Sequence, residues 1–319
     1  MCVIYLLNRG SKACLRGGRL LVERDGERVA SVPLAETECV IVSEHTQVTT
    51  EATFKLLAQH SPLIYVDFRG RVQAVLEDAG GHSLDRLQRQ MQACGEPDTQ
   101  LTLVRELVAA KLASQKEFLR RHSFKQREAA REALRCLDDM LAKLPDLDLE
   151  ALRGCEGAAA RMYFDFFPLI LPEGWEWHGR SRRPAKDAVN ALLNYGYAFL
   201  EREVRLAVLG AGLDRRIGFF HANNGRKDSL IYDLMEPFRS SIMDTFILRQ
   251  LSYKRFQPEQ FVLSDEEGCR IQPEARQRWA EDYESYMETP RKSLQGQTPR
   301  AWLRQRIRHF AVDLLAHSA

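Results

Sequence analysis

Residues 72–91, VQAVLEDAGGHSLDRLQRQM, contain the change of pattern that decides the fold. On the N-terminal side, 72–76 is a short run rich in valine and leucine, which predicts a strand. The pair Gly80-Gly81 then interrupts the chain, and from Leu84 onward apolar residues recur at the spacing of a helix. The sequence therefore predicts a small β-rich domain before this glycine pair and a large α-helical domain after it.

The predicted N-terminal domain, residues 1–80, consists of short strands separated by turns. Asp25-Gly26 is the strongest hairpin signal, because both residues tolerate positive φ and stand between two apolar runs. Thr50 is a candidate cap for a short helix that ends at Leu57. The expected strands are 3–7, 20–22, 29–32, 39–42, 63–66 and 72–76.

The predicted C-terminal domain, residues 81–319, is helical throughout. Val104, Leu107, Val108 and Leu112 share one helix face. Further helices are expected over 126–144, over 188–209 with Gly210 as C-cap, over 228–251, and from Pro299 behind the cap Thr298. The fold class is thus α+β, with a small β domain followed by an all-α domain.

Composition restricts the function classes. The chain has 319 residues and a net charge of only +2, so any nucleic-acid surface must be a local patch. Seven cysteines without a CxxC pair argue against a zinc ribbon and favour reduced thiols in a cytoplasmic protein. The N-terminus is expected to be a strand and not a signal peptide, and no apolar stretch approaches the roughly 20 residues that span a bilayer.

The first block with chemical potential surrounds Glu156. This acid stands between Gly154 and Gly157, before a run of alanines, and such small residues allow close approach of other groups. Glu156 could therefore reach into a site. The alternative is a closely packed helix in which Glu156 is an acid of the first turn, favoured by the helix dipole.

The second block, 180–193, is basic and precedes a helix. Arginine forks and exposed helix N–H groups both match phosphate oxygens, while a solvated basic loop is the alternative. Pro184 and Asp187 suit a helix start, and Asn190 is an amide in an apolar stretch that needs hydrogen-bond partners. The candidate DNA-binding residues here are Arg180, Arg182, Arg183, Lys186 and Asn190.

The third block contains His221, which follows the apolar run 217–220 and begins a polar loop with Arg226. An imidazole at this place could be a ligand at the edge of a pocket. A structural hydrogen-bonding histidine is the alternative. We include Arg226 among the candidate DNA-binding residues because of its charge and position.

The fourth block places Asp233 and Glu236 on one face of a helix, with Arg239 three residues further on. A surface ladder of ion pairs is possible, but the acids alternate with apolar residues, so the helix is expected to be buried. Pro237 frees the carbonyl of Asp233 and kinks the helix beside the paired acids. Arg239 could neutralise one acid, and it is a further candidate DNA-binding residue.

Carboxylates with an imidazole form a donor set that suits Mg²⁺ or Mn²⁺ and leaves positions for water and phosphate. A hard divalent cation beside arginine side chains is a typical arrangement in active sites that catalyse phosphoryl transfer. The residues alone therefore favour phosphodiester chemistry.

In their order and spacing, these four blocks resemble the CRISPR-associated integrase family ("Cas one"). The matching blocks are Gly154-Cys155-Glu156-Gly157-x-Ala159-Ala160-Arg161-x-Tyr163-Phe164, Arg182-Arg183-Pro184-x-x-Asp187-x-Val189-Asn190-Ala191-Leu192-Leu193, Gly218-Phe219-Phe220-His221 and Ser229-Leu230-x-Tyr232-Asp233-Leu234-Met235-Glu236-Pro237-Phe238-Arg239. The resemblance implies a DNA endonuclease and strand transferase that inserts captured fragments, or spacers, into a CRISPR array by attack of 3′-hydroxyl groups.

The resemblance also implies a set of ligands and partners. Glu156, His221 and Glu236 would be the catalytic residues and bind Mg²⁺ or Mn²⁺, with Asp233 assisting. The protein would act on double-stranded DNA, both the spacer precursor and the CRISPR repeat. It would form a homodimer through its β domain and work with a small ferredoxin-like CRISPR-associated partner in the prokaryotic cytoplasm.

The sequence departs from the family at Arg215-Arg216 and at Ala185, where prolines are common, and these changes leave the expected ligands intact. Two other functions stay open. One is a metal-dependent nuclease that hydrolyses branched or single-stranded nucleic acid, since water and a 3′-hydroxyl can use the same site. The other is a helical nucleic-acid-binding or scaffolding protein without catalysis.

Overall fold

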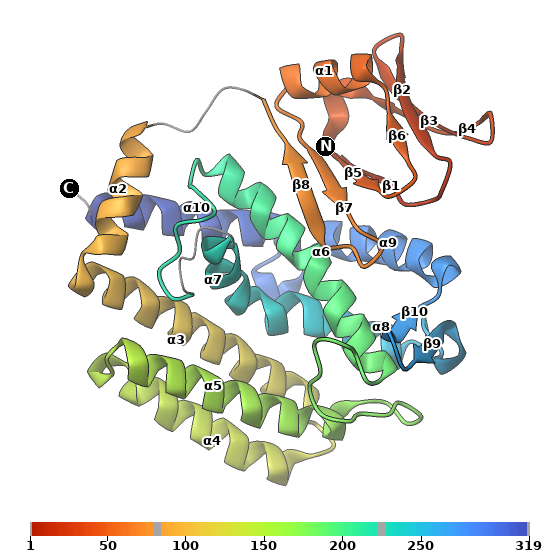
Figure 1. The fold of residues 1–319 in the computed structure, drawn as a ribbon. Coiled ribbons are helices and arrows are strands. Elements are labelled where there is room, and N and C mark those ends of the chain that lie inside the picture. The colour runs from red at the N-terminus through yellow and green to blue at the C-terminus, as the bar shows by residue number, and fades with distance from the viewer. Residues whose placement is uncertain (1, 79–83, 222–227, 318–319) are drawn as a thin grey trace. The chain divides into compact units, whose positions relative to one another are not determined.

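A computed structural model describes residues 2–78, 84–221 and 228–317, and the chain divides into two compact units (Figure 1). The units are Met1–Gly81 and His82–Ala319, so the division lies one residue from the boundary predicted at Gly80-Gly81. The first unit is β-rich and the second is mainly helical, which confirms the predicted α+β fold class. The second unit is not helical throughout, because residues 261–264 and 268–271 form a two-stranded sheet.

In its described residues, 2–78, the N-terminal unit contains two four-stranded sheets and one α-helix, α1 (Thr50–Ala58). The first sheet has the order β1 (Cys2–Leu6), β5 (Thr37–Ser43), β7 (Leu63–Val66) and β8 (Val72–Leu76); only β8 is antiparallel to its neighbour. The second has the order β4 (Glu27–Pro33), β3 (Arg19–Arg24), β2 (Lys12–Arg16) and β6 (Gln47–Val48), and a 3₁₀ turn, η1 (Leu34–Glu36), follows β4. Leu6, Leu20, Val40 and Leu56 are buried together in one core that both sheets and α1 share.

The hairpin predicted at Asp25-Gly26 is present between β3 and β4, with φ of 53° and 83° at the two central residues. Strands β2 and β6 were not predicted. The helix cap was predicted one residue too late, because it is Thr49, not Thr50, whose hydroxyl accepts the N–H of Ala52.

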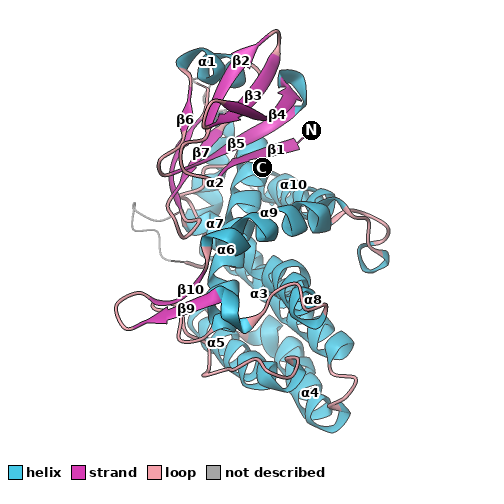
Figure 2. Ribbon diagram, turned by 90° about the vertical axis from the view of Figure 1, so that its right-hand side faces the viewer, coloured by secondary structure: helices cyan, strands magenta, loops and turns pink. Residues whose placement is uncertain are grey.

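The helical unit begins with α2 (Leu84–Gly95) and α3 (Pro97–His122), which precede α4 (Arg127–Lys143) and α5 (Leu149–Phe166). The unit continues with α6 (Ala188–Gly210), α7 (Ser229–Phe238), α8 (Thr245–Ser252), β9 (Phe261–Ser264), β10 (Gly268–Ile271), α9 (Pro273–Glu288) and α10 (Pro299–His317), which Figures 1 and 2 show. Short turns of other helical types lie between these elements: η2 (Leu144–Asp146), η3 (Phe167–Ile170), η4 (Arg239–Asp244), η5 (Pro258–Gln260) and η6 (Lys292–Leu294). Helices α3, α4 and α5 lie side by side, and α7 packs between α3 and α6.

Helix α6 is buried along most of its length and starts at the predicted place, because the side chain of Asp187 accepts the N–H of Asn190. The predicted C-cap at Gly210 is wrong. Gly210 belongs to the helix, and the left-handed residue is Gly212, with φ of 69°. The aromatic core beside α6 includes Phe199, Trp279 and Tyr283, whose rings meet edge to face.

The single helix predicted over 228–251 is divided into three parts. Helix α7 ends at Phe238 one residue after Pro237, and η4 is a wide π-helical turn. Two hydroxyls satisfy carbonyls of this stretch: Ser241 Oγ donates to the Pro237 oxygen and Thr245 Oγ1 to the Ser240 oxygen, each at 2.9 Å. Proline removes one helical hydrogen bond, and the chain widens directly after it.

No described helix combines the length and the apolar character that crossing a lipid bilayer requires.

Candidate active site

Asp233 on α7 organises the segment that carries His221. This carboxylate is 1% exposed, and both of its oxygens accept hydrogen bonds. Oδ2 accepts the backbone N–H groups of Phe219 and Phe220, at 2.6 and 3.0 Å. Oδ1 accepts the backbone N–H of His221 at 2.9 Å and lies 2.6 Å from its Nδ1. A buried carboxylate with four hydrogen bonds therefore fixes both the backbone and the imidazole of His221.

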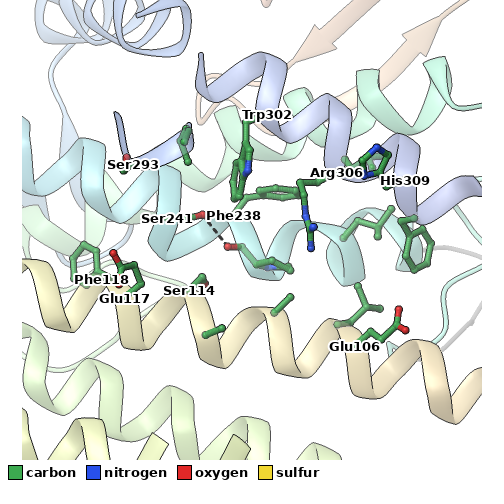
Figure 3. A pocket seen from close by; sticks show the side chains of 18 of the residues that line it. Glu106, Ser114, Glu117, Phe118, Phe238, Ser241, Ser293, Trp302, Arg306 and His309 are labelled. Carbon is green, nitrogen blue, oxygen red and sulfur yellow. Dashed lines mark hydrogen bonds between the residues drawn. The ribbon is translucent and has the colours of Figure 1, made fainter. Parts of the chain in front are cut away.

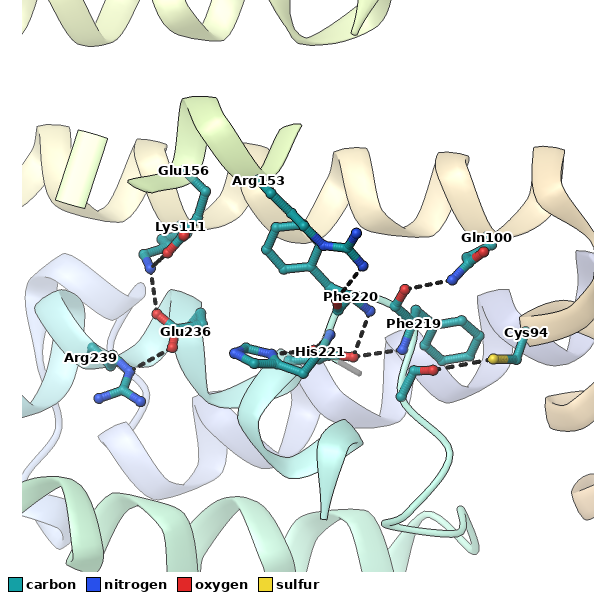
Figure 4. A network of polar contacts seen from close by, with 12 residues as sticks. Cys94, Gln100, Lys111, Arg153, Glu156, Phe219, Phe220, His221, Glu236 and Arg239 are labelled. Carbon is teal, nitrogen blue, oxygen red and sulfur yellow. Dashed lines mark hydrogen bonds and ion pairs between the residues drawn. The ribbon is translucent and has the colours of Figure 1, made fainter. Parts of the chain in front are cut away.

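The carbonyl groups of the same segment are held from the other side by three helices. Cys94 Sγ on α2 donates to the Gly218 oxygen, and Gln100 Nε2 on α3 donates to the Phe219 oxygen, at 3.2 and 2.8 Å. Arg153 Nη2 on α5 donates to the Phe220 oxygen at 3.2 Å. Figure 4 shows these contacts in a row along the segment. The segment is thus bound along both edges, which pre-organises His221.

Gly218 is required by the close packing of this segment on α7. A Cβ at Gly218 would lie 2.7 Å from Oδ2 of Asp233 and 2.7 Å from Cβ of Ser229. Both contacts are far shorter than van der Waals distance. Only glycine lets the backbone approach the carboxylate closely enough for the hydrogen bonds of Phe219 and Phe220.

Two glutamates from different helices contact the same ammonium group, that of Lys111. Lys111 Nζ on α3 donates to Oε1 of Glu156 on α5, and it lies 2.6 Å from Oε2 of Glu236 on α7. Arg239 binds the other oxygen of Glu236, with Nε to Oε1 at 2.9 Å. Burial alone would raise the pKa of Glu236, but Arg239 and Lys111 outweigh it and lower the pKa to about 2. Glu236 is therefore ionised at every physiological pH.

The imidazole of His221 completes this group. Its side chain is 45% exposed, and Figure 4 shows the ring on the side of Glu236. Because Nδ1 faces Asp233, the outer nitrogen, Nε2, is the one directed away from that carboxylate. Three of the predicted ligands, Glu156, His221 and Glu236, are thus brought together, whereas Asp233 lies behind His221 and uses both oxygens on the segment 219–221.

The donor set fits a divalent metal ion, since two carboxylates already share one cation and an oriented imidazole stands beside them. Within the described ranges, no three His, Cys, Asp or Glu side chains lie close enough to one point to hold a metal as they stand. Lys111 lies where the two carboxylates converge.

Sequence reasoning missed Lys111, although a signal was present. It follows Leu107 by four residues and Val108 by three, so it lies on the apolar face of α3, where a lysine is unusual. A lysine on a buried stripe indicates a buried anion elsewhere in the fold.

Arg239 also connects the site to a buried acid. Its guanidinium carbon lies 4.3 Å from the centre of the Tyr197 ring, and the Tyr197 hydroxyl donates to Oδ1 of Asp244 at 2.8 Å. The Tyr163 hydroxyl donates to Oδ2 at 2.7 Å. Burial raises the pKa of Asp244 to about 6, although both tyrosines and Arg239 oppose the shift.

The predicted DNA-binding residues divide into buried and exposed groups. Asn190 is fully buried and uses its whole amide within the chain: Oδ1 accepts from Arg180 Nη1 and Ser181 N, and Nδ2 donates to the Gly179 oxygen and Asp187 Oδ2. Arg180 also donates to the Ser181 oxygen and to Asn194. These two residues shape the basic segment, on which Arg182, Arg183 and Lys186 are exposed. Arg226 lies outside the described residues.

A cavity of about 450 Å³ is lined by residues of α3, α7 and α10, among others. Figure 3 shows Trp302 and Phe238 above Ser114 in it, with Arg306 and His309 from α10. The Ser114 and Ser240 hydroxyls are 2.7 Å apart, where α3 packs against η4. Glu236 and Lys111 are not among the residues that line this cavity.

Comparison with known proteins gives a consistent result. Residues 4–285 match the family model described as CRISPR associated protein Cas1. The chain is 33% identical over 282 residues to a CRISPR-associated exonuclease Cas4/endonuclease Cas1 fusion of Geobacter sulfurreducens, covering 85% of this chain and 50% of that protein. It is also 33% identical over 282 residues to a CRISPR-associated endonuclease Cas1 of Thermus thermophilus, covering 88% of this chain and 85% of that protein.

Solved structures share the fold, among them these two. A chain of a Cas6-RT-Cas1–Cas2 complex superposes with a TM-score of 0.84 at 21% identity, covering 99% of this chain and 35% of that one. A casposase bound to an integration product superposes with the same TM-score at 22% identity, covering 99% of this chain and 91% of that one.

Proposed function

Because the chain belongs to the Cas1 family of CRISPR-associated proteins, we propose that it is a metal-dependent DNA endonuclease and integrase that joins captured DNA fragments to a CRISPR array. The observation that carries this proposal is the convergence of Glu156, Glu236 and His221 from three separate elements. Two half-buried carboxylates that face each other beside an oriented imidazole are costly for a purely structural role, and such costs concentrate at functional sites.

Glu156, Glu236 and His221 would hold Mg²⁺ or Mn²⁺. When bound, the metal would polarise the scissile phosphate and help to orient the attacking oxygen. Asp233 would keep the imidazole in one orientation, with Nδ1 toward its own Oδ1 and Nε2 toward the metal. Arg239 keeps Glu236 ionised, which favours the binding of a cation.

DNA would approach along the exposed basic residues Arg182, Arg183 and Lys186, which precede the N-terminus of α6. Asn190 and Arg180 would act indirectly, by holding this segment through their hydrogen bonds. The substrates would be double-stranded fragments and the CRISPR repeat. Arg226 belongs to the same proposal because of its charge.

Strand transfer, with a 3′-hydroxyl as nucleophile, is preferred to hydrolysis because the similar casposase fold is bound to an integration product. Hydrolysis by the same residues is the second candidate function, since the Thermus relative is described as an endonuclease. A partner equivalent to Cas2, which is present in a complex of similar fold, would bridge two copies of the chain. Those copies would pair through the β-rich unit, whose strands β7 and β8 expose Tyr65 and Leu76.

The proposal is tested with a labelled branched DNA that mimics a half-integrated product, incubated with Mn²⁺ or with EDTA. We expect resealing of the strand with Mn²⁺, none with EDTA, and none with His221→Ala. Lys116→Met is a matched control, because Lys116 pairs with the exposed Asp138 away from the site. Nicking without joining would select hydrolysis, and undiminished activity of His221→Ala would reject the site.

A further inference from the structure

Lys111 is held as a cation between two carboxylates from different helices. Its side chain is only 9% exposed, and the described contacts of its ammonium group are those with Glu156 and Glu236. A buried ammonium group is costly unless anions surround it, and here two of them do. Its long apolar stem comes from α3, whereas the carboxylates come from α5 and α7.

The charges of this cluster show why a cation is needed there. Glu156 and Glu236 would repel each other if they faced each other alone. Of the two glutamates, Arg239 pairs with Glu236, through Oε1. The described contacts of Arg239 include none with Oε2 of Glu236 or with Glu156. Lys111 supplies the compensating charge there and so keeps α5 and α7 close at this point.

A divalent metal ion would need the same oxygens. Glu156 Oε1 and Glu236 Oε2 already face the ammonium group, and an ammonium and a metal cation cannot share one position because of their mutual repulsion. A lysine, unlike an arginine, is a point charge on a flexible stem with no planar fork to fix it. Its head can therefore leave the pair without a change in the backbone of α3.

We propose that Lys111 is an exchangeable cation, which occupies the metal position in the metal-free protein and is displaced into solvent when a divalent ion binds Glu156 and Glu236. This inference rests on the proposed metal-dependent function and adds to it a residue that sets metal affinity. Displaced Lys111 is then available to an anion, such as a phosphate of bound DNA.

The first experiment measures Mn²⁺ binding to the full chain by titration calorimetry, without DNA. We expect Lys111→Met to bind Mn²⁺ at least about tenfold more tightly than the wild type, because a competitor has been removed. Lys116→Met, on the same helix, should leave the affinity unchanged. Glu156→Gln should weaken binding strongly and shows that the measured site is this one.

The outcomes separate the inference from the function on which it rests. If Glu156→Gln weakens binding but Lys111→Met does not strengthen it, Lys111 is no competitor and only this inference fails. If neither the wild type nor Lys111→Met binds Mn²⁺, the proposed metal site fails and the inference fails with it.

The second experiment tests displacement in the unmodified protein and so does not depend on the folding of a variant. The wild type is acylated with a water-soluble succinimidyl ester, with and without Mg²⁺, and modification is quantified by peptide mass spectrometry. We expect Mg²⁺ to increase acylation of Lys111 severalfold and to leave Lys116 unchanged. A rate at Lys111 that stays constant or falls on addition of Mg²⁺ would overturn displacement.

Discussion

Nδ1 of His221 lies 2.6 Å from Oδ1 of Asp233, and the same oxygen accepts the backbone N–H of His221. One carboxylate oxygen thus determines both where the residue lies and how its ring is turned. The arrangement resembles the carboxylate–histidine pairs that orient metal-binding imidazoles in other proteins. Asp233 is therefore a positioning residue. The effect of substituting Asp233 can be compared with the effect of substituting His221 itself.

Asp233→Asn should reduce strand resealing by about 10- to 100-fold and weaken Mn²⁺ binding by a similar factor. The amide has one oxygen in place of two acceptors, so it cannot receive all three backbone N–H groups and also face Nδ1. Resealing kinetics and calorimetry measure the two effects. Asp138→Asn, at an exposed acid on α4, is the control and should change neither.

Gly218→Ala should lower the free energy of unfolding by about 1–3 kcal/mol and also reduce activity, because the new Cβ would collide with Asp233 and Ser229. Urea unfolding measures the stability change. Gly154→Ala is the comparison: its added Cβ meets nothing within 4 Å beyond the adjoining backbone of its own helix, so this variant should be more stable by about 0.5–1 kcal/mol. Equal stabilities of the two variants would contradict the close approach at Gly218.

Asp244 should give the protein a measurable pH dependence of stability. The pKa of Asp244 is raised from 3.8 to about 6 in the folded state. Between these two pH values, Asp244 is largely protonated in the folded chain and largely ionised in the unfolded chain. Stability should therefore fall as pH rises through this window, whereas Asp244→Asn should lack that contribution. Urea unfolding of both proteins from pH 4.5 to 7 measures the difference in slope.

The control for this experiment is Asp138→Asn, a substitution at an exposed acid of α4 whose ion pair is with Lys116. Parallel curves for the wild type and Asp244→Asn would show that Asp244 stays ionised across the range. That result would mean that the two tyrosines and Arg239 compensate its burial completely.

Replacing Arg182, Arg183 and Lys186 by alanine should weaken DNA binding and reduce its salt dependence. If each side chain neutralises one phosphate, the slope of log K against log salt should become shallower by about 3. Fluorescence anisotropy at several salt concentrations measures the slope. Folding should be unaffected, because these three side chains are exposed and the hydrogen bonds that hold their segment belong to Arg180, Asn190 and Asn194. An unchanged slope would place the DNA elsewhere.

Several features followed directly from the sequence because their causes are local. The turn at Asp25-Gly26 and the cap at Asp187 depend on residues within three positions, and the change from strands to helices at Gly80-Gly81 is a change of period. The order and spacing of the blocks around Glu156, Asn190, His221 and Glu236 also sufficed to identify the family.

The tertiary structure alone decided what these residues do together. Lys111 and Glu156 are 45 residues apart in the sequence. The position of Lys111 on an apolar stripe indicates a buried anion, but it does not show that this anion is the pair Glu156 and Glu236. The π-helical turn after Pro237 and the contact of Gly218 with Asp233 likewise depend on how α7 packs against α3 and α6. Periodicity and caps are set by interactions a few residues apart, whereas the pairing of buried charges is set by which helix faces meet. For that reason the sequence could name Glu156 and Glu236 as candidate ligands, but only the fold could show the lysine that lies between them.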